Sequence, residues 1–228
     1  MTRVERLRVL NEKSYEAIAE AFDASRQHPW RELGRYANDI REGDRILDLG
    51  CGNGRLLKAL PNVNYEYVGI DGNEFLISQA KAEAPRSIFC RERLEDVELV
   101  SGSFDHIFCI ATFHHLVTRE DRQLLLKKCH EALKPEGILI LAVWNLWQWK
   151  YMRYLFSQVT YKISWNDFFV PWKLPAGTVW RYYHGFTARE LVSLFREAGF
   201  TRSELDQEEA MSSQQWKKSN YIVRAVKE

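Results

Sequence analysis

The sequence predicts an α/β fold, namely a doubly wound sheet of seven strands that ends in an antiparallel hairpin. Strand-like apolar segments alternate with segments of helical period over residues 45–143, as they do in parallel βαβ units. A glycine-rich turn, DLGCGNG at residues 48–54, follows the first of these strands. Two strand-like segments close the chain after the last expected helix, and they predict a hairpin at the sheet edge.

The order of the elements is regular. Residues 3–22 carry apolar side chains at helical spacing, and Pro29 is expected to open a second helix up to about residue 40. The parallel strands are expected at 45–47, 65–71, 87–90, 104–110 and 138–143. Further helices are expected from residue 55, at 74–84, at 119–133 and at 187–199. The closing strands are expected at 201–207 and 219–226.

Length and composition indicate one globular domain. A chain of 228 residues, with 46% hydrophobic and 28% charged residues, can bury a large core. We expect a single domain over 1–228, with N-terminal cover helices at 1–42 and an insertion at 146–186. The charged N-terminus and the absence of an apolar run of roughly 20 residues predict a cytoplasmic protein without a membrane partner. The four cysteines form no C-x-x-C pair, so no metal site is expected.

The glycine spacing in DLGCGNG indicates which ligand the turn binds. A dinucleotide fingerprint would place its third glycine at Arg55, and a Walker loop would need a lysine after Gly54. The remaining pattern, G-x-G-x-G behind Asp48, is that of S-adenosylmethionine (SAM) methyltransferases. An ordinary tight turn would need only two glycines.

Two acidic residues are expected to serve this ligand. Asp71 ends the second strand and can accept hydrogen bonds from both ribose hydroxyls, although it could also cap the following helix. Asp48 is expected to organise the glycine turn or to contact the SAM ammonium group.

The insertion at 146–186 interrupts the alternation of strands and helices. Fourteen of its 41 residues are aromatic, and five basic residues stand against one acidic residue, Asp167. Aromatic rings among basic charges are typical of single-stranded nucleic acid binding, with Lys150, Arg153, Lys162 and Lys173 as candidate phosphate contacts. The alternative is a hydrophobic lid, in which Trp147, Trp149, Tyr151 and Tyr154 form the buried face of a helix.

Several motifs together resemble one family. They are YxxIAxxFDxSRxxPW at 15–30, DLGCGNG at 48–54, IATFHHL at 110–116, VW at 143–144, VPWK at 170–173 and RYYHGF at 181–186. In this order they resemble the tRNA wobble-uridine carboxymethyl methyltransferases, in particular the compact fungal form and the methyltransferase part of the AlkB-fused animal relative. The resemblance covers roughly residues 14–226. It implies a class I, Rossmann-like methyltransferase fold, SAM as cofactor, tRNA as substrate and a small zinc-binding activator protein as a partner.

The residues agree with the reaction that this resemblance implies, the esterification of a carboxymethyl group. A carboxylate is ionised at neutral pH, because its pKa is about 4, so it needs cationic clamps rather than a general base. Candidates for the catalytic site are Arg181, His184, Tyr182 and His114, with Tyr182 or Tyr183 stacking on the base. Arg26 is expected to hold the SAM carboxylate, unless it pairs with Asp23 at the surface.

The expected cofactor site draws on all of these motifs. Its residues are Tyr15, Arg26, Trp30, Asp48, Gly50, Cys51, Gly52, Asn53, Gly54, Asp71, Gly72, Asn73, Arg93, Leu94, Ile110, Ala111 and His115. Two other functions stay open. One is SAM-dependent methylation of a small carboxylic acid, phenol or amine, and the other is a non-catalytic subunit that binds SAM or RNA.

Overall fold

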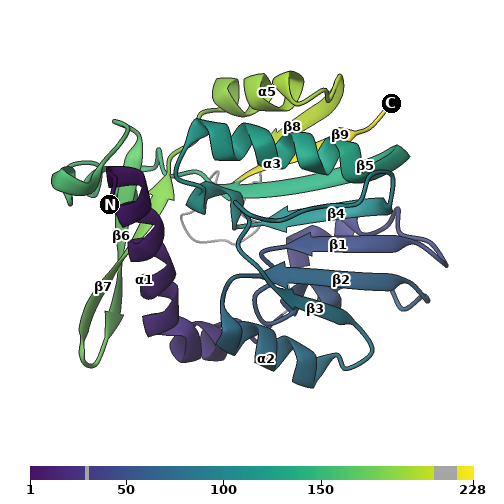
Figure 1. Cartoon of the computed structure of the whole chain (residues 1–228), viewed down its shortest axis with the longest axis horizontal. Coiled ribbons are helices and arrows are strands. Elements are labelled where there is room, and N and C mark those ends of the chain that lie inside the picture. The colour runs from purple at the N-terminus through teal and green to yellow at the C-terminus, as the bar shows by residue number, and fades with distance from the viewer. Residues whose placement is uncertain (29–30, 208–219) are drawn as a thin grey trace.

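The computed structural model describes residues 1–28, 31–207 and 220–228 of the chain. Within them, a mixed seven-stranded sheet comprises β1 Arg45–Leu49, β2 Glu66–Asp71, β3 Ile88–Arg91, β4 Phe104–Ile110, β5 Leu133–Trp144, β8 Arg202–Gln207 and β9 Asn220–Val226 (Figure 1). The spatial order is β3-β2-β1-β4-β5-β9-β8. Strands β1 to β5 run parallel, and β9 pairs antiparallel with both β5 and β8. The predicted doubly wound sheet with its terminal hairpin is confirmed.

The four longer helices are α1 Arg3–Ser25, α2 Glu74–Glu83, α3 Arg119–Ala132 and α5 Ala188–Glu197. Each begins where a side-chain oxygen accepts a backbone N–H of the first turn, at Thr2, Asn73, Thr118 and Thr187. Helices α3 and α5 cover one face of the sheet, packing on Leu47 and Leu139, while α2 packs on the other face near Ile46. Across the described ranges, none of the helices has the length and apolar character needed to cross a bilayer.

Two expected helices are shorter and tighter than predicted. Arg31–Tyr36 and Arg55–Ala59 each form a 3-10 helix. Gly34 interrupts the first of these segments and weakens an α-helix there. The second ends at Leu60, whose extended backbone precedes Pro61.

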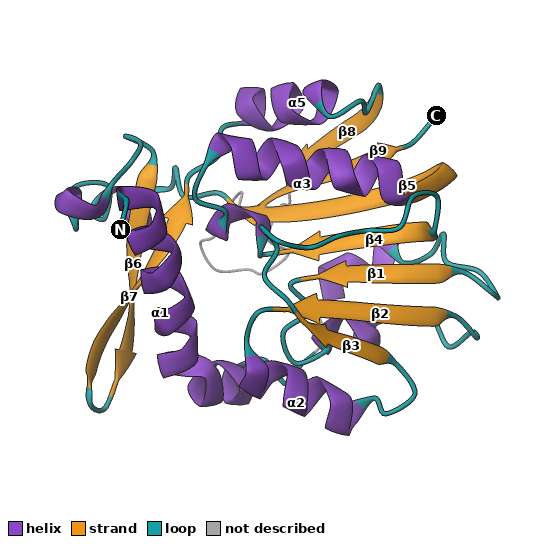
Figure 2. Cartoon of the chain, viewed as in Figure 1, coloured by secondary structure: helices purple, strands orange, loops and turns teal. Residues whose placement is uncertain are grey.

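The insertion contains a hairpin that the sequence analysis did not predict. Strands β6 Asp167–Leu174 and β7 Gly177–His184 pair antiparallel in a separate sheet, beside α1 and beyond the carboxyl ends of the parallel strands (Figure 2). The expected helix is only α4, Trp149–Met152. The rings of Trp147, Tyr151 and Tyr154 pack on the hairpin, as the lid alternative predicted, but Trp149 is exposed.

Candidate active site

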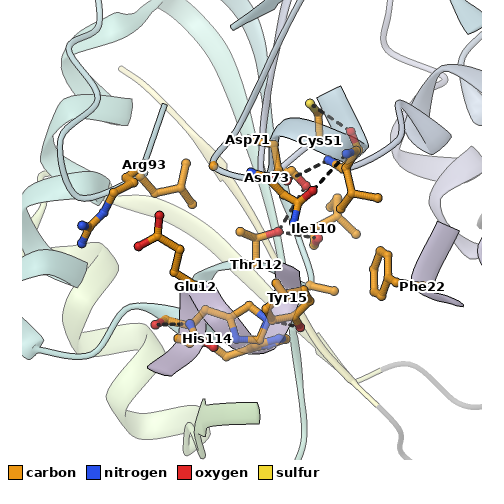
Figure 3. Close-up of a pocket in the computed structure, with 18 of the residues that line it drawn as sticks. Glu12, Tyr15, Phe22, Cys51, Asp71, Asn73, Arg93, Ile110, Thr112 and His114 are labelled. Atoms are coloured by element: carbon orange, nitrogen blue, oxygen red, sulfur yellow. Dashed lines mark hydrogen bonds between the residues drawn. The ribbon is translucent and has the colours of Figure 1, made fainter. Parts of the chain in front are cut away.

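A cavity of about 320 Å³ lies at the carboxyl ends of β1, β2 and β4. Side chains of α1 and β7 line its other side, and Figure 3 shows Tyr15 and Phe22 of α1 facing Asp71 and Thr112. The strand order reverses between β1 and β4, which is where ligands bind in open α/β sheets. The topology therefore places the predicted site residues of the sheet around one cavity.

The glycine turn exposes its backbone to this cavity. Gly50, Gly52 and Gly54 have φ angles of 76°, 54° and 75°, a region that favours glycine. A Cβ atom at Gly50 would lie 2.2 Å from the Thr112 side chain, whereas one at Gly52 would meet no atom closer than 4.0 Å. The turn is tied to the end of β2, because the Gly50 N–H donates to the Ile70 carbonyl over 2.7 Å.

Asp71 stands at the end of β2 with both carboxylate oxygens directed at backbone amides. Its Oδ2 accepts the Gly52 N–H at 2.9 Å, and its Oδ1 accepts the Asn73 N–H at 2.8 Å. Burial raises the pKa of Asp71, while these two hydrogen bonds act in the opposite direction. Each oxygen keeps a further lone pair, so the carboxylate can still accept hydrogen bonds from a ligand's hydroxyls.

Asp48 is a buried acid at the base of the same cavity. It is 3% exposed, and its Oδ2 accepts the Tyr67 hydroxyl at 2.6 Å. Burial raises its pKa from 3.8 to about 7, although the hydrogen bond from Tyr67 lowers it. At neutral pH this carboxyl group is therefore partly protonated. A cation bound beside it would favour the ionised form and would be stabilised by its charge.

Strand β7 presents Arg181 and Tyr183 to the cavity, and its alternate residues point away from it. Tyr182 donates to Asp167 Oδ1 at 3.0 Å, and His184 Nε2 lies 2.8 Å from Glu190 Oε1, both on the other face of the hairpin. The expectation that Tyr182 and His184 contact substrate is therefore corrected. Side chains two apart on a strand share a face, so Arg181 belongs with Tyr183 and not with His184.

Three hydrogen-bonding side chains join α1 to β7 in this cavity. His115 Nδ1 lies 3.0 Å from the Tyr182 carbonyl, which can only accept, so this nitrogen carries the proton. His115 Nε2 then accepts the Tyr15 hydroxyl at 2.8 Å, and Tyr15 in turn accepts the Tyr183 hydroxyl at 3.3 Å. Burial lowers the pKa of His115 to about 3, which keeps the ring neutral in this chain of hydrogen bonds.

His114 also lines the cavity and has one ring nitrogen without a partner. The Trp144 backbone N–H donates to its Nδ1 at 3.3 Å, which leaves the proton on Nε2. Nε2 is buried and has no hydrogen-bond partner in the described part of the chain. Burial holds the pKa of His114 well below its usual value, so the neutral ring offers one N–H donor.

A row of stacked rings and guanidinium groups runs past the cavity. In spatial order it comprises Arg26, Phe22, Trp172, Arg181, Tyr183, Trp144 and Tyr151. The Arg181 guanidinium carbon lies 4.8 Å from the Trp172 ring centroid and 5.2 Å from that of Tyr183. This sandwich fixes the plane of a guanidinium group that is otherwise withdrawn from water.

Comparison with known proteins identifies the enzyme class. Residues 47–141 match the family described as "Methyltransferase domain". A protein of Encephalitozoon cuniculi named as a methyltransferase is 30% identical over 187 residues, which cover 82% of this chain and 84% of that protein. A solved SAM-dependent methyltransferase of Methanosarcina mazei has a similar fold, with a TM-score of 0.70 at 23% identity over 88% of this chain and 98% of its own. The chain belongs to the class I SAM-dependent methyltransferases.

Relatives of this methyltransferase include proteins with a more specific name. The tRNA (carboxymethyluridine(34)-5-O)-methyltransferase of Schizosaccharomyces pombe is 31% identical over 208 residues, covering 81% of this chain and 86% of that protein. The protein of the same name in Xenopus tropicalis is 29% identical over 136 residues, or 60% of this chain. The matched region spans only 21% of the Xenopus protein's length.

The cofactor of the methyltransferase is SAM, and the cavity has groups that fit it. Asp71 offers acceptors for ribose hydroxyls, Asp48 offers a counter-charge for an ammonium group, and Leu94 and Ile110 offer apolar surface for a base. Of the expected cofactor-site residues, Gly54 lies outside the cavity lining and starts the 3-10 helix instead. Trp30 lies outside the described residues, and the others all line the cavity.

The cavity residues of the methyltransferase that were not assigned from the sequence include Phe22, Thr112 and Trp144. Phe22 follows Tyr15 by two helical turns, so the two share one face of α1, and this spacing could have identified it. Trp144 ends β5 at the same sheet edge as the other strand ends. Thr112 carries no sequence signal, because its role is its close approach to Gly50.

Proposed function

We propose that this methyltransferase esterifies the carboxylate of the carboxymethyl group on the wobble uridine of tRNA. The observation that carries the proposal is Arg181, which lines the cavity and is 4% exposed. Its Nε has no hydrogen-bond partner, and it forms no ion pair with a carboxylate of the described residues. A buried guanidinium group without an internal anion is suited to an anionic ligand, and a carboxylate can meet it with two parallel hydrogen bonds.

The chemistry requires positioning rather than proton transfer. SAM supplies a methyl group on a positively charged sulfur. A carboxylate oxygen forms the new bond to the methyl carbon, the carbon–sulfur bond breaks, and its electron pair stays on sulfur, so that no proton moves. Arg181 and the His114 Nε2–H would hold the carboxylate on the cavity side, while neutral Tyr15 and His115 exclude water beside it.

The proposed contacts to SAM follow from the same geometry. Asp71 would accept the ribose hydroxyls and Asp48 would face the ammonium group. Arg26 would hold the SAM carboxylate, because the end of α1 is tied to the glycine turn where Asn53 donates to Asp23 Oδ1 at 2.8 Å. That bond also engages Asp23, which weakens the alternative in which Arg26 pairs with Asp23.

The relatives support tRNA as the substrate and an activator protein as a partner. Besides the S. pombe protein, one of Saccharomyces cerevisiae with the same printed name is 29% identical over 164 residues. A solved complex of the Haloferax volcanii Trm112 methyltransferase activator with a methyltransferase shares the fold, with a TM-score of 0.65 and 18% identity over 95% of this chain. We extend both properties, tRNA methylation and activation by such a small protein, to this chain as part of the proposal.

The variant Arg181→Lys tests the carboxylate clamp. Lysine keeps the charge but loses the fork and the stacking on Trp172, so kcat/KM on tRNA should fall roughly 10- to 100-fold with SAM affinity nearly unchanged. The matched control is Arg202→Lys on β8, whose parent side chain is 57% exposed and remote from the cavity lining. Full activity of Arg181→Lys on carboxymethyluridine tRNA would contradict the proposal.

A further inference from the structure

Three large aromatic side chains of the insertion are left open to solvent. Trp149 is 92% exposed, Phe156 is 79% exposed and Trp165 is 70% exposed. All three lie within 17 residues of chain. Isolated exposed apolar residues are common, but several large rings exposed in one short segment indicate a binding surface.

The rings nearer the cavity are not free to stack on a ligand. Tyr183 lies between the Trp144 ring, stacked at 5.2 Å, and the Arg181 guanidinium at 5.2 Å. Trp144 in turn stacks with both Tyr183 and Tyr151, whose ring centroids lie 5.2 Å and 6.5 Å from its own. The expectation that Tyr182 or Tyr183 stacks on the substrate base is therefore not met, because Tyr182 faces away and Tyr183 is already sandwiched.

The charge of this segment is complementary to a polyanion. Arg153 and Lys173 are exposed and form no ion pair among the described residues, and Lys150 adds a third positive charge on α4. The single acid of the insertion, Asp167, is 1% exposed and accepts hydrogen bonds from Tyr182 and from backbone amides. Lys162 is not available to a phosphate as the sequence analysis expected, since its ammonium group donates to the carbonyls of Leu155 and Asp167.

Two of the exposed rings, Trp149 and Trp165, are linked to the active site through packed neighbours. Trp165 lies 5.2 Å from Trp147, whose indole N–H donates to the Gly185 carbonyl just after β7. Trp149 begins α4, which also carries Tyr151, the partner of the cavity-lining Trp144. A ligand that stacks on Trp149 would therefore lie on the helix whose Tyr151 packs against a ring of the cavity wall.

We propose that Trp149, Phe156 and Trp165 stack on unpaired nucleotides that flank the modified uridine in the tRNA anticodon loop, a role that rests on the proposed function. Stacking on exposed rings beside cationic side chains is how proteins bind single-stranded nucleic acid without reading its sequence. A membrane surface fits less well, because interfacial anchors are long amphipathic helices and α4 has only four residues. Arg153 and Lys173 would contact the phosphates of the same loop.

The test measures binding of a fluorescently labelled anticodon stem-loop RNA to the full chain in the presence of SAM. Trp149→Ala and Trp165→Ala should each weaken the affinity roughly 5- to 100-fold, with little change in SAM affinity. Trp149→Phe should retain most of the affinity, because it keeps a ring. The matched control is Leu124→Ala on α3, which removes a side chain that is 47% exposed outside the insertion and should leave RNA affinity unchanged.

Other outcomes would overturn the inference. One is equal RNA affinity of the Trp149→Ala, Trp165→Ala and wild-type proteins, and another is no RNA binding by the wild type. A third is that the wild type binds anionic lipid vesicles and the tryptophan variants do not. Methyl transfer is measured separately on the same samples. If RNA binding depends on the tryptophans but no methyl is transferred, the proposed function is wrong and the RNA-binding surface is supported. If methyl transfer to tRNA is unaffected by the tryptophan variants, the proposed function is supported and the RNA-binding surface is wrong.

Discussion

At pH 8, replacing Asp48 by Asn should stabilise the fold while it weakens SAM binding. Asp48 is 3% exposed, and burial raises its pKa from 3.8 to about 7. Asparagine keeps the shape and can still accept the Tyr67 hydroxyl, which donates to Asp48 at 2.6 Å. The substitution therefore removes the titrating group, and with it the proposed counter-charge for SAM, without opening a cavity.

The magnitude follows from the pKa shift. Because the folded pKa is raised, the folded protein holds a proton that the unfolded chain has already lost between about pH 4 and pH 7. The wild-type free energy of unfolding should thus fall with rising pH by about 1.4 kcal/mol per pH unit in this window, or about 4 kcal/mol in total. The variant lacks this loss, although its buried amide N–H costs about 1–3 kcal/mol at every pH. A net gain of about 1–3 kcal/mol is expected at pH 8.

Urea unfolding at pH 5, 6, 7 and 8 measures this difference between Asp48→Asn and the wild type. The pH-dependence of the difference is decisive, because the cost of the amide does not change with pH. Tyr67→Phe is the control, since it removes the hydrogen bond that lowers the pKa and leaves the carboxyl group to titrate. A constant difference between Asp48→Asn and wild type from pH 5 to pH 8 would refute the reasoning. Calorimetry should show weaker SAM binding by the same variant.

Three further predictions concern the turn, the ribose site and the hairpin. Asp71→Ala should weaken SAM binding by about 2–4 kcal/mol, since the ribose loses a charged acceptor; unchanged affinity by calorimetry would argue against the assignment. Gly50→Ala should destabilise the fold far more than Gly102→Ala in thermal unfolding, because both have positive φ but only the Gly50 site places a Cβ 2.2 Å from Thr112; equal effects would reject the clash. His184→Ala should cost roughly 2–4 kcal/mol of stability, because it removes a buried ring and the partner that Glu190 Oε1 meets at 2.8 Å. The activity of this variant per folded molecule should stay close to that of the wild type. A loss of turnover without a loss of stability would indicate that His184 acts in catalysis.

The sheet, and the convergence of the glycine turn with Asp71 at one of its edges, could be predicted because the signals are local. Alternating apolar segments define parallel strands, and the glycine turn and Asp71 stand at the ends of two of them. The carboxyl ends of parallel strands meet at one edge, so their terminal residues converge without any knowledge of side-chain packing. The terminal hairpin was predicted from two strand-like segments at the end of the chain, and β8 and β9 pair antiparallel as expected.

The hairpin over the cavity could not be predicted in the same way. Residues 181–184 read Arg-Tyr-Tyr-His, so both faces of the strand carry large polar or aromatic side chains and no alternation of apolar with polar residues marks it. The same composition hides which residues share a face, which is why His184 and Tyr182 were grouped with Arg181. The buried cluster of Asp167, Tyr182 and His184 forms only through the pairing of β6 with β7.

Transfer of a labelled methyl group from SAM to tRNA that carries the free carboxymethyluridine would test the proposed esterification. The reaction is run with and without the small activator protein, and the product is then treated with mild alkali. Esterification predicts label on the wobble uridine that alkali releases as methanol, and a loss of this transfer in Arg181→Lys. No transfer to tRNA under either condition, or label that survives alkali as a methyl on carbon or nitrogen, would show that the enzyme does not esterify this carboxylate.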